Sequence, residues 1–463
     1  MFKKIFGLMV GFFCVACTVG DNYRRPQFYA DAVVQNELEL KENGNLPDNW
    51  YETLGDDYLN YLVKEGMANN SDIITSIAKL KQSRLTVNIN NAAYLPQVGI
   101  KGGYDYQKNS KNIGYVQDID YYSNGFDASW ELDIWGKGRR QKEADKANIK
   151  AQEYSLSNIR SVVAAEIVLN YVKMQENIDN LKMARKNADL QRQISEYTQK
   201  EYKNGMSDET AYNQAMYLLQ TTLSQIPEYE NNIETYKNSL STLIGVLPSS
   251  LSAFNKTQLM RKDYGYMSEK MRKLPLSVIR LRPDVAAAEQ NLKAQNALLG
   301  KSIAELYPSV NIGALWGYSA KFFSELYSSS SETYSLSPAF NLPLLDWNKL
   351  QNNIEAQRQE TKIALVTYKQ KVLDAIVELK NSFSAYQAAT ESYRKKLAAQ
   401  NHMQKVVENM SKRYKNGLIK FSELLTSEQN LIEAQKDVIT ARTQILSSII
   451  AYYKASGATI IDN

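Results

Sequence analysis

Apolar residues recur with helical spacing over two stretches that are far longer than an ordinary globular helix. In residues 137–203, Val163, Ile167, Tyr171 and Met174 follow one another at intervals of three or four. Neither this stretch nor residues 350–415 contains a proline, and Gly138 is their only glycine. At about 1.5 Å per residue, a helix over 137–203 would be about 100 Å long. The pattern predicts two long helical rods.

The second half of the chain repeats landmarks of the first half at an offset of 212 residues. The matching positions are Asn204 and Asn416, Gly205 and Gly417, Pro96 and Pro308, Trp135 and Trp347, and Gly245 and Gly457. A fixed offset over so many landmarks indicates an internal duplication. The sequence predicts one copy over 62–245 and a second over 274–457, with a linker at 246–273 and a tail at 458–463.

Each copy contains the same predicted elements in the same order. A short helix comes first, at 72–93 and 284–305. A pair of strands follows, within 95–134 and 306–345. The long rod is next, and a turn at Asn204-Gly205 or Asn416-Gly417 ends it, because glycine suits a left-handed helix C-cap. A last helix closes each copy, at 207–244 and 421–456.

The last helix of the second copy has apolar residues at every seventh position. One column consists of Leu424, Leu431, Val438, Ile445 and Tyr452. A seven-residue period predicts left-handed coiled-coil packing against neighbouring helices. Taken alone, the rods fit either a bundle with a filled core or a closed ring of helices.

The four predicted strands alternate between apolar and polar residues. Examples of the apolar positions are Val98, Ile100, Tyr104 and Tyr106 in the first strand, and Tyr334, Leu336, Phe340, Leu342 and Leu344 in the last. Segments of about ten such residues are typical of transmembrane β-strands, although a soluble sheet shows the same alternation. Four strands cannot close a barrel, and lipid does not tolerate open sheet edges. Strands that cross a membrane would therefore require several chains, and three chains would supply twelve.

The N-terminus has the features of an export signal. Lys3 and Lys4 precede a short apolar run. Residues 14–17, Cys-Val-Ala-Cys, resemble a bacterial lipobox, which makes 1–16 a signal peptide and Cys17 the residue that carries lipid. Thr18 then resembles the sorting signal of outer-membrane lipoproteins. The alternative is an ordinary signal peptide with incidental cysteines. Residues 17–61 are the expected lipid-anchored N-terminal segment.

Composition excludes several classes of function. The net charge is +5 and no dense basic block occurs, so a nucleic-acid partner is not expected. Cys14 and Cys17 are the only cysteines and His402 is the only histidine, so we expect no catalytic residues, no metal site and no cofactor. Beyond the N-terminus, no apolar run is long enough for a membrane-spanning helix.

Several stretches together resemble the outer membrane efflux protein (TolC-like) family, in its OprM-type lipoprotein branch. They are Cys-Thr-Val-Gly-Asp-Asn-Tyr-Arg-Arg-Pro at 17–26, Ala-Ser-Trp-Glu-Leu-Asp-Ile-Trp-Gly at 128–136, Arg-Pro-Asp-Val-Ala-Ala-Ala-Glu at 282–289, Tyr-Pro-Ser-Val at 307–310, Leu-Pro-Leu at 342–344 and Arg-Tyr-Lys-Asn-Gly at 413–417. The resemblance implies an α+β membrane protein. Its parts would be a long α-helical coiled-coil barrel in the periplasm and a transmembrane β-barrel in the outer membrane, shared by a homotrimer with four strands per chain.

The resemblance also implies partners and sites. A periplasmic adaptor protein would dock at the helical-tip turns, Asn204, Gly205, Asn416 and Gly417. An inner-membrane pump, of the RND type, would supply energy, and outer-membrane lipid would surround the strands. Glu423 would form an acidic ring at the channel entrance. Thr426 stands where the family often has Asp, so a second ring would be absent. By itself, Glu423 is equally consistent with a solvated acid in the first turn of a helix.

The sequence thus predicts a non-enzymatic exit duct of a tripartite efflux pump, which passively conducts small toxic compounds or drugs. A lipid-anchored periplasmic coiled-coil scaffold is the alternative from a different class. Ducts of the same fold for protein secretion or metal-ion export are further alternatives.

Overall fold

The protein is described by a computed structural model, which covers residues 18–26, 28, 49–110, 112, 118–250 and 276–458. The predicted signal peptide, Cys17, and most of the predicted linker and tail lie outside these described residues. The described residues form two compact units. We call the first the sheet unit (within Met1–Gln27, Lys79–Glu153 and Ala287–Lys369) and the second the hairpin unit (within Phe28–Ala78, Tyr154–Ala286 and Gln370–Asn463). Each unit draws segments from both halves of the chain.

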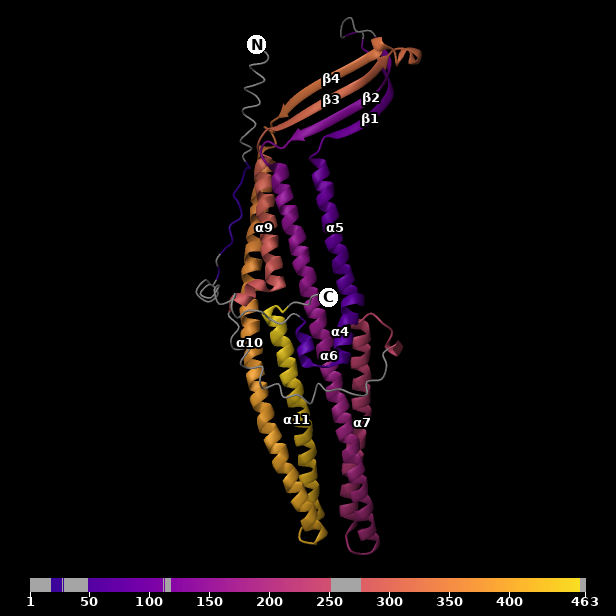
Figure 1. The fold of residues 1–463 in the computed structure, drawn as a ribbon, viewed down its shortest axis with the longest axis vertical. Helices are drawn as coiled ribbons and strands as arrows, with labels where there is room; N and C mark the ends of the chain where they lie inside the picture. The colour runs from indigo at the N-terminus through magenta and orange to yellow at the C-terminus, as the bar shows by residue number, and fades with distance from the viewer. Residues whose placement is uncertain are drawn as a thin grey trace. The chain divides into compact units, whose positions relative to one another are not determined.

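The sheet unit contains one antiparallel sheet with the strand order β1-β2-β3-β4 (Figure 1). The strands are β1 (Gln97–Gln107), β2 (Ile119–Leu132), β3 (Ser309–Ala320) and β4 (Glu332–Asn341). Short 3-10 turns, η6 (Phe323–Glu325) and η7 (Ser329–Ser331), connect β3 to β4. Consecutive strands are neighbours, so β1 and β4 form the two edges of the sheet.

The strand register places the predicted apolar residues on one face. Ile100 lies opposite Phe126, and Phe126 lies opposite Trp316 on the next strand. Trp316 in turn lies opposite Tyr334 of β4. Because cross-strand partners share a face, the alternation in the sequence becomes one apolar face that extends across all four strands.

The last strand is shorter than the sequence predicted. β4 ends at Asn341, so Leu342 and Leu344 are not strand residues. Asn341 pairs with Ser309, the first residue of β3, and Pro308 precedes it. Neither Pro308 nor Pro343 has an N–H to donate, so the ladder stops there.

Helices α5 (Ser71–Ala93) and α9 (Pro283–Ala304) begin 212 residues apart, as the duplication predicts. α9 starts at Pro283, whose missing N–H has no intrahelical partner at this position anyway. In the sheet unit, α9 packs closely against α6 (Lys137–Lys203) through small residues. They are Ala144 and Ala147 of α6 and Ala294 and Ala297 of α9.

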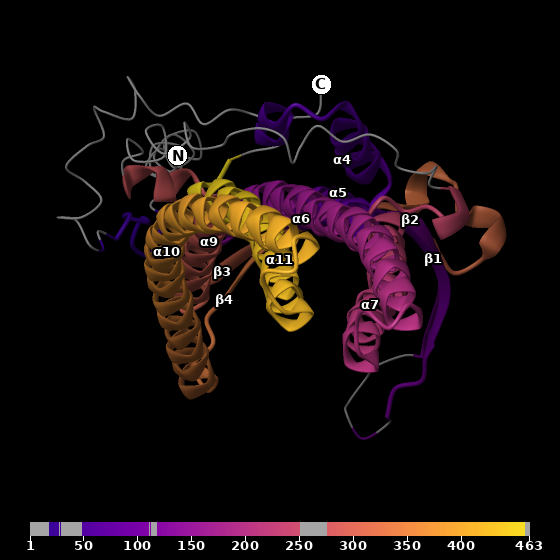
Figure 2. The same ribbon diagram turned by 90° about the horizontal axis from the view of Figure 1, so that it is seen from below.

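Two helical hairpins characterise the hairpin unit. α7 (Glu209–Leu243) runs back beside α6, and α11 (Phe421–Ser456) runs back beside α10 (Trp347–Lys415) (Figures 1 and 2). α6 and α11 have the predicted bounds. α10 begins three residues before the predicted start, and α7 begins at Glu209 instead of Ser207 because the Asp208 carboxylate caps it by accepting from the Ala211 N–H at 3.1 Å.

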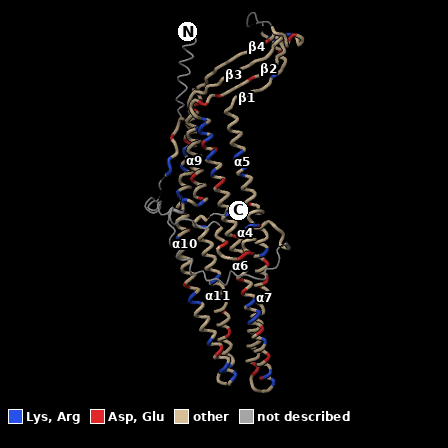
Figure 3. The backbone as a smooth tube through the Cα atoms, viewed as in Figure 1, with Lys and Arg blue, Asp and Glu red and all other residues tan. Residues whose placement is uncertain are grey.

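The predicted seven-residue column of α11 is buried within a single chain. The exposed fractions of its five members, Leu424, Leu431, Val438, Ile445 and Tyr452, are between 2% and 7%. Acidic and basic residues are interspersed along the helices, whereas the strands carry few of either (Figure 3). None of the described helices combines the length and the apolar character that a bilayer span requires.

Short elements complete the hairpin unit. They are η1 (Trp50–Leu54), α4 (Asp57–Asn69), η3 (Pro248–Ser250) and η5 (Leu276–Leu281). Trp50 stacks on Tyr453 of α11 with ring centroids 5.1 Å apart, and both side chains are buried. The Tyr171 hydroxyl of α6 donates to Asp56, the N-cap residue of α4, at 3.0 Å. These contacts attach α4 and η1 to the hairpins.

Candidate functional site

The two glycine turns of the hairpin unit have the same geometry. Gly205 and Gly417 adopt φ values of +70° and +69°, and the following residues, Met206 and Leu418, donate their N–H groups to carbonyls five residues earlier at 2.8 and 2.9 Å. This pattern is a left-handed C-cap of the Schellman type, which confirms the conformation predicted for both turns. A Cβ at either glycine would meet no neighbour within 4 Å, so the backbone conformation, and not crowding, favours glycine.

Large apolar side chains are exposed at both turns. Met206 is 78% exposed and Leu418 is 66% exposed, and the two occupy equivalent positions in the repeat. Both follow directly after a turn glycine in the sequence, and this position was a usable signal that the sequence predictions above do not include. Asn204 and Asn416 are exposed beside them. Together, these four residues and the two glycines form what we call the tip surface.

A groove of about 510 Å³ lies between the two turns. Its lining includes Glu201, Met206, Tyr414, Gly417 and Phe421. Across it, the Tyr414 hydroxyl of α10 donates to the Glu201 carboxylate of α6 at 2.8 Å. Burial and this hydrogen bond raise the pKa of Tyr414, so the phenol stays protonated. The bond links the ends of the two long helices.

The predicted entrance residues lie on one exposed turn near the start of α11. The Glu423 carboxylate accepts from the Lys420 backbone N–H at 3.4 Å, and the Thr426 hydroxyl donates to the Ser422 carbonyl at 2.9 Å. Within one chain, both side chains thus point to local backbone partners. Their place at a channel entrance stays a prediction.

The apolar face of the sheet is strongly exposed. Ile100 and Leu336 are each 72% exposed, Phe340 is 79% exposed and Tyr334 is 80% exposed. A soluble protein rarely leaves so many large apolar side chains in one contiguous patch. The edge strands β1 and β4 also have no strand partner on their outer sides within the described residues. Within the described residues, the apolar face therefore has no covering layer and each edge strand lacks one partner strand.

Residues 18–26 are fixed within the sheet unit by polar contacts. Arg140 of α6 is 1% exposed, and its guanidinium donates to the carbonyls of Val19 at 3.0 Å and Gly20 at 2.5 Å. The Val19 N–H donates to the Trp135 carbonyl at 3.2 Å. Arg25 pairs with Glu289 of α9 at 2.6 Å. The chain that directly follows Cys17 is therefore held against α6 and against the connection between β2 and α6. Cys17 itself lies outside the described residues.

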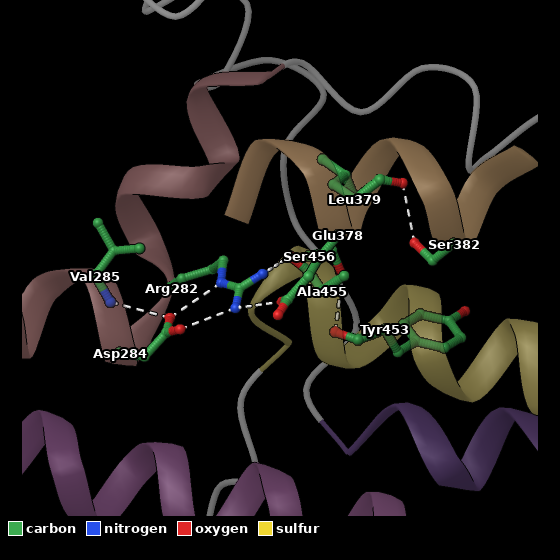
Figure 4. A network of polar contacts seen from close by, with 9 residues as sticks. All are labelled: Arg282, Asp284, Val285, Glu378, Leu379, Ser382, Tyr453, Ala455 and Ser456. Carbon is green, nitrogen blue, oxygen red and sulfur yellow. Dashed lines mark hydrogen bonds and ion pairs between the residues drawn. The ribbon is translucent and has the colours of Figure 1, made fainter. Parts of the chain in front are cut away.

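The Arg-Pro-Asp motif at residues 282–284 forms a clamp in the hairpin unit (Figure 4). The Arg282 guanidinium pairs with Asp284 at 2.9 Å and with Glu378 of α10 at 2.8 Å, and it donates to the Ala455 carbonyl of α11 at 3.0 Å. Burial alone would raise the pKa of Asp284, but Arg282 outweighs burial and lowers it. In the sequence this motif contributes only to the family resemblance, whereas in the structure it links α9, α10 and α11.

Metal-ligating groups do not cluster in the part of the chain that the structure describes. No three His, Cys, Asp or Glu residues of that part are arranged to hold an ion. His402 is exposed on α10. The candidate sites that the described residues offer are therefore surfaces of the hairpin unit and of the sheet.

Comparison with known proteins identifies relatives over nearly the whole chain. The model of the outer membrane efflux protein family matches twice, over residues 62–246 and 274–458. The cation efflux system protein CusC of Escherichia coli (strain K12) is 23% identical over 457 residues, which are 96% of this chain and 98% of CusC. The probable outer membrane lipoprotein SilC of Salmonella typhimurium is 22% identical, with 95% of each chain covered. The solved structure of the outer-membrane channel OprN is 25% identical, with a TM-score of 0.86, covering 96% of this chain and 99% of that one.

Proposed function

Because the chain belongs to the outer membrane efflux protein family, we propose that it is the exit duct of a tripartite pump for small toxic compounds or drugs. The duct performs no bond chemistry and conducts its cargo passively across the outer membrane. The observation that carries the proposal is the exposed apolar face of a four-stranded sheet whose edges β1 and β4 have no partners among the described residues. The two family matches also support the duplicated halves at 62–245 and 274–457.

A homotrimer would give both edge strands a partner and would place the apolar face of the sheet against lipid. Three chains supply twelve strands, so β1 of one chain can pair with β4 of the next and the barrel has no open edge. The apolar face then meets lipid, and the polar alternate positions line the lumen. The hairpins of three chains would form the periplasmic α-helical barrel.

The tip surface is the proposed docking site of the periplasmic adaptor. Met206 and Leu418 are large, apolar and exposed, which is typical of residues that a partner covers. The polar side chains Asn204 and Asn416 beside them can supply hydrogen bonds at the rim. An inner-membrane pump of the RND type would act through that adaptor.

The start of α11 is the proposed entrance of the channel. Threefold repetition around an axis would bring three Glu423 carboxylates together, which would attract cations to the constriction. Thr426 provides no second charge. The Tyr414–Glu201 bond would oppose opening, because separation of the hairpins at the tip breaks it.

Cys17 is the proposed site of lipidation. The contacts of Val19 and Gly20 with Arg140 support an anchor, because they fix the chain immediately after this cysteine. The name of SilC as a probable lipoprotein also supports it. Several acyl chains per trimer would make the anchoring stable.

Planar-bilayer recording with the purified protein tests the proposal. The duct predicts discrete conductance steps and a trimer in detergent, whereas a periplasmic scaffold passes no current. A chain that lacks residues 1–17 and remains a water-soluble monomer without detergent would refute the shared barrel. Because CusC is named for cation efflux, susceptibility assays of a deletion strain should compare metal salts with organic drugs to identify the cargo class.

A further inference from the structure

A small cavity lies inside the hairpin unit, where α6, α7 and α11 meet. Its volume is about 10 Å³, which is room for about one water molecule. Six of its lining residues are apolar, namely Ile194, Ala215, Leu218, Phe421, Leu424 and Leu425. The other two are Gln191 of α6 and Glu428 of α11. A pair of polar side chains from two different helices in an apolar cavity requires an explanation.

Gln191 is buried without hydrogen bonds. It is 2% exposed, and neither Oε1 nor Nε2 has a partner among the described residues. Leaving both a donor and an acceptor unsatisfied in the interior costs folding free energy. The Gln191 amide therefore needs a partner that can donate to its oxygen and accept from its nitrogen.

Glu428 faces the same cavity. Its carboxyl makes no hydrogen bond or ion pair within the described part of the chain, and burial raises its pKa. No charged group contributes to that shift. The titratable groups near the cavity are exposed or have other partners: on α6, Asp189 pairs with Arg192; on α7, the Tyr212 hydroxyl accepts from Gln199; and on α11, Glu423 is exposed. Tyr414 of α10 donates to Glu201 of α6.

The protonation state of Glu428 decides whether Gln191 can be satisfied. An ionised carboxylate accepts hydrogen bonds and donates none, so it could serve Nε2 of Gln191 and would leave Oε1 unpaired. A neutral carboxyl offers one O–H donor and a carbonyl acceptor, which match the amide. We propose that this cavity is a proton-binding site, in which neutral Glu428 donates to Oε1 of Gln191 and accepts from its Nε2, directly or through one water molecule.

A neighbouring contact sets the register of the same two helices. The Asn187 amide of α6, one turn from Gln191, donates to Oε1 of Gln435 on α11 at 3.2 Å. That contact contains no titratable group. The proton site thus adds a pH-dependent link between the hairpins to one that does not respond to pH. Loss of the proton from Glu428 therefore weakens the contact between α6 and α11. This consequence does not depend on whether the chain forms a duct.

Infrared difference spectroscopy of the full-length protein in detergent tests the proton site directly. A neutral carboxyl has a C=O band that ionised carboxylates lack. We expect one such band to persist well above the ordinary titration range of glutamate, to disappear in Glu428→Gln and to remain in Glu433→Gln, which alters an exposed acid of the same helix. Absence of the band, or its persistence in Glu428→Gln, would overturn the proposal.

Two further variants test whether Gln191 is the partner. Gln191→Leu removes the hydrogen bonds of the neutral carboxyl, so its C=O band should shift to higher frequency. Gln435→Leu disrupts the neighbouring amide contact and should leave the band in place. An unshifted band in Gln191→Leu would exclude Gln191 as the partner.

The melting temperature provides a second, independent readout. Because burial raises the folded pKa of Glu428, its contribution is favourable at low pH and is lost as the pH rises through that value. Glu428→Gln mimics the neutral acid at every pH. The melting temperatures of the variant and the wild type should agree at about pH 3.5, below the ordinary pKa of glutamate, and the variant should melt about 1–3 °C higher at about pH 8. A difference that does not change with pH would contradict the proposal.

Discussion

Substitution of Arg282 by Met should destabilise the hairpin unit strongly. The Arg282 side chain is 8% exposed, and methionine is long enough to fill most of its space without its charge. The change removes the guanidinium that pairs with the Asp284 carboxylate and donates to the Ala455 carbonyl. The substitution therefore tests the contribution of the Arg282 charge to stability, while most of the packing around the side chain is retained.

The magnitude follows from the exposure of each partner. Removing one member of a buried ion pair costs about 3–5 kcal/mol, because the other charge stays buried and unpaired. Asp284 is 21% exposed, which reduces this cost. Glu378 is 56% exposed, so its pair with Arg282 contributes at most about 1 kcal/mol. We expect a loss of about 2–4 kcal/mol at neutral pH.

The loss should depend on pH with a defined sign. In the wild type, Arg282 lowers the pKa of Asp284 below its ordinary value, so the pair stabilises the fold above pH 3.8 and ceases to do so as the pH falls through the lowered value. In the variant, burial, which is the largest influence on Asp284, is opposed only by the Val285 N–H and by Lys371, so the pKa of Asp284 rises above its wild-type value. The ionised carboxylate then destabilises the fold at neutral pH, and protonation relieves that cost in acid.

Thermal unfolding followed by far-ultraviolet circular dichroism in detergent measures both effects. Arg394→Met is the matched control, because Arg394 of α10 is 71% exposed and pairs with an exposed glutamate. The double variant Arg282→Met with Asp284→Asn should recover part of the loss, since it removes the unpaired charge. If Arg282→Met melts like Arg394→Met at both neutral and acid pH, the contacts of Arg282 do not stabilise the hairpin unit.

Three further outcomes test the proposed duct. Tyr414→Phe removes a hydrogen bond to a charged group, which contributes about 1.5–3 kcal/mol, and should raise the conductance in planar bilayers. Tyr217→Phe, which alters an exposed tyrosine, should leave the conductance unchanged. Equal conductance of the two variants would contradict the proposal that the Tyr414–Glu201 bond opposes opening. Leu418→Asp should abolish drug resistance and reduce cross-linking to the adaptor, with normal trimer levels; full resistance would argue against docking at the tip. Phe340→Asp on the apolar face of β4 should lower the amount of trimer in outer-membrane fractions, whereas Ser337→Asp on the opposite face should have little effect; equal effects would refute the assignment of the lipid face.

The sequence predicted the regular elements well because their signals are local. The bounds of α6 and α11 agree with the uninterrupted apolar periods, and the left-handed turns agree with Gly205 and Gly417. The strand faces agree with the alternation, because side chains point to opposite faces at successive residues. The errors were at ends, where Asp208 caps α7 and where Pro308 and Pro343 stop the β3–β4 ladder.

The tip turns were predictable from the sequence, but the hydrogen bond that links the two hairpins beside them was not. Tyr414 and Glu201 are 213 residues apart. Nothing local marks the two as partners, since both are ordinary surface residue types for a helix. Glu428 stands in a polar stretch of α11, and only its neighbours on α6 and α7 show that it lines a mostly apolar cavity.

The sequence by itself determined the helices, the strands, their faces and the duplication, because periodicity, turn chemistry and a fixed offset are properties of the chain order. The tertiary structure alone decided which polar groups come together: Arg282 bonds to Ala455, Arg140 bonds to the chain after Cys17, and Gln191 and Glu428 line one cavity. The physical reason is that burial and hydrogen-bond partnership depend on side chains brought together from distant segments, which no single stretch of sequence encodes.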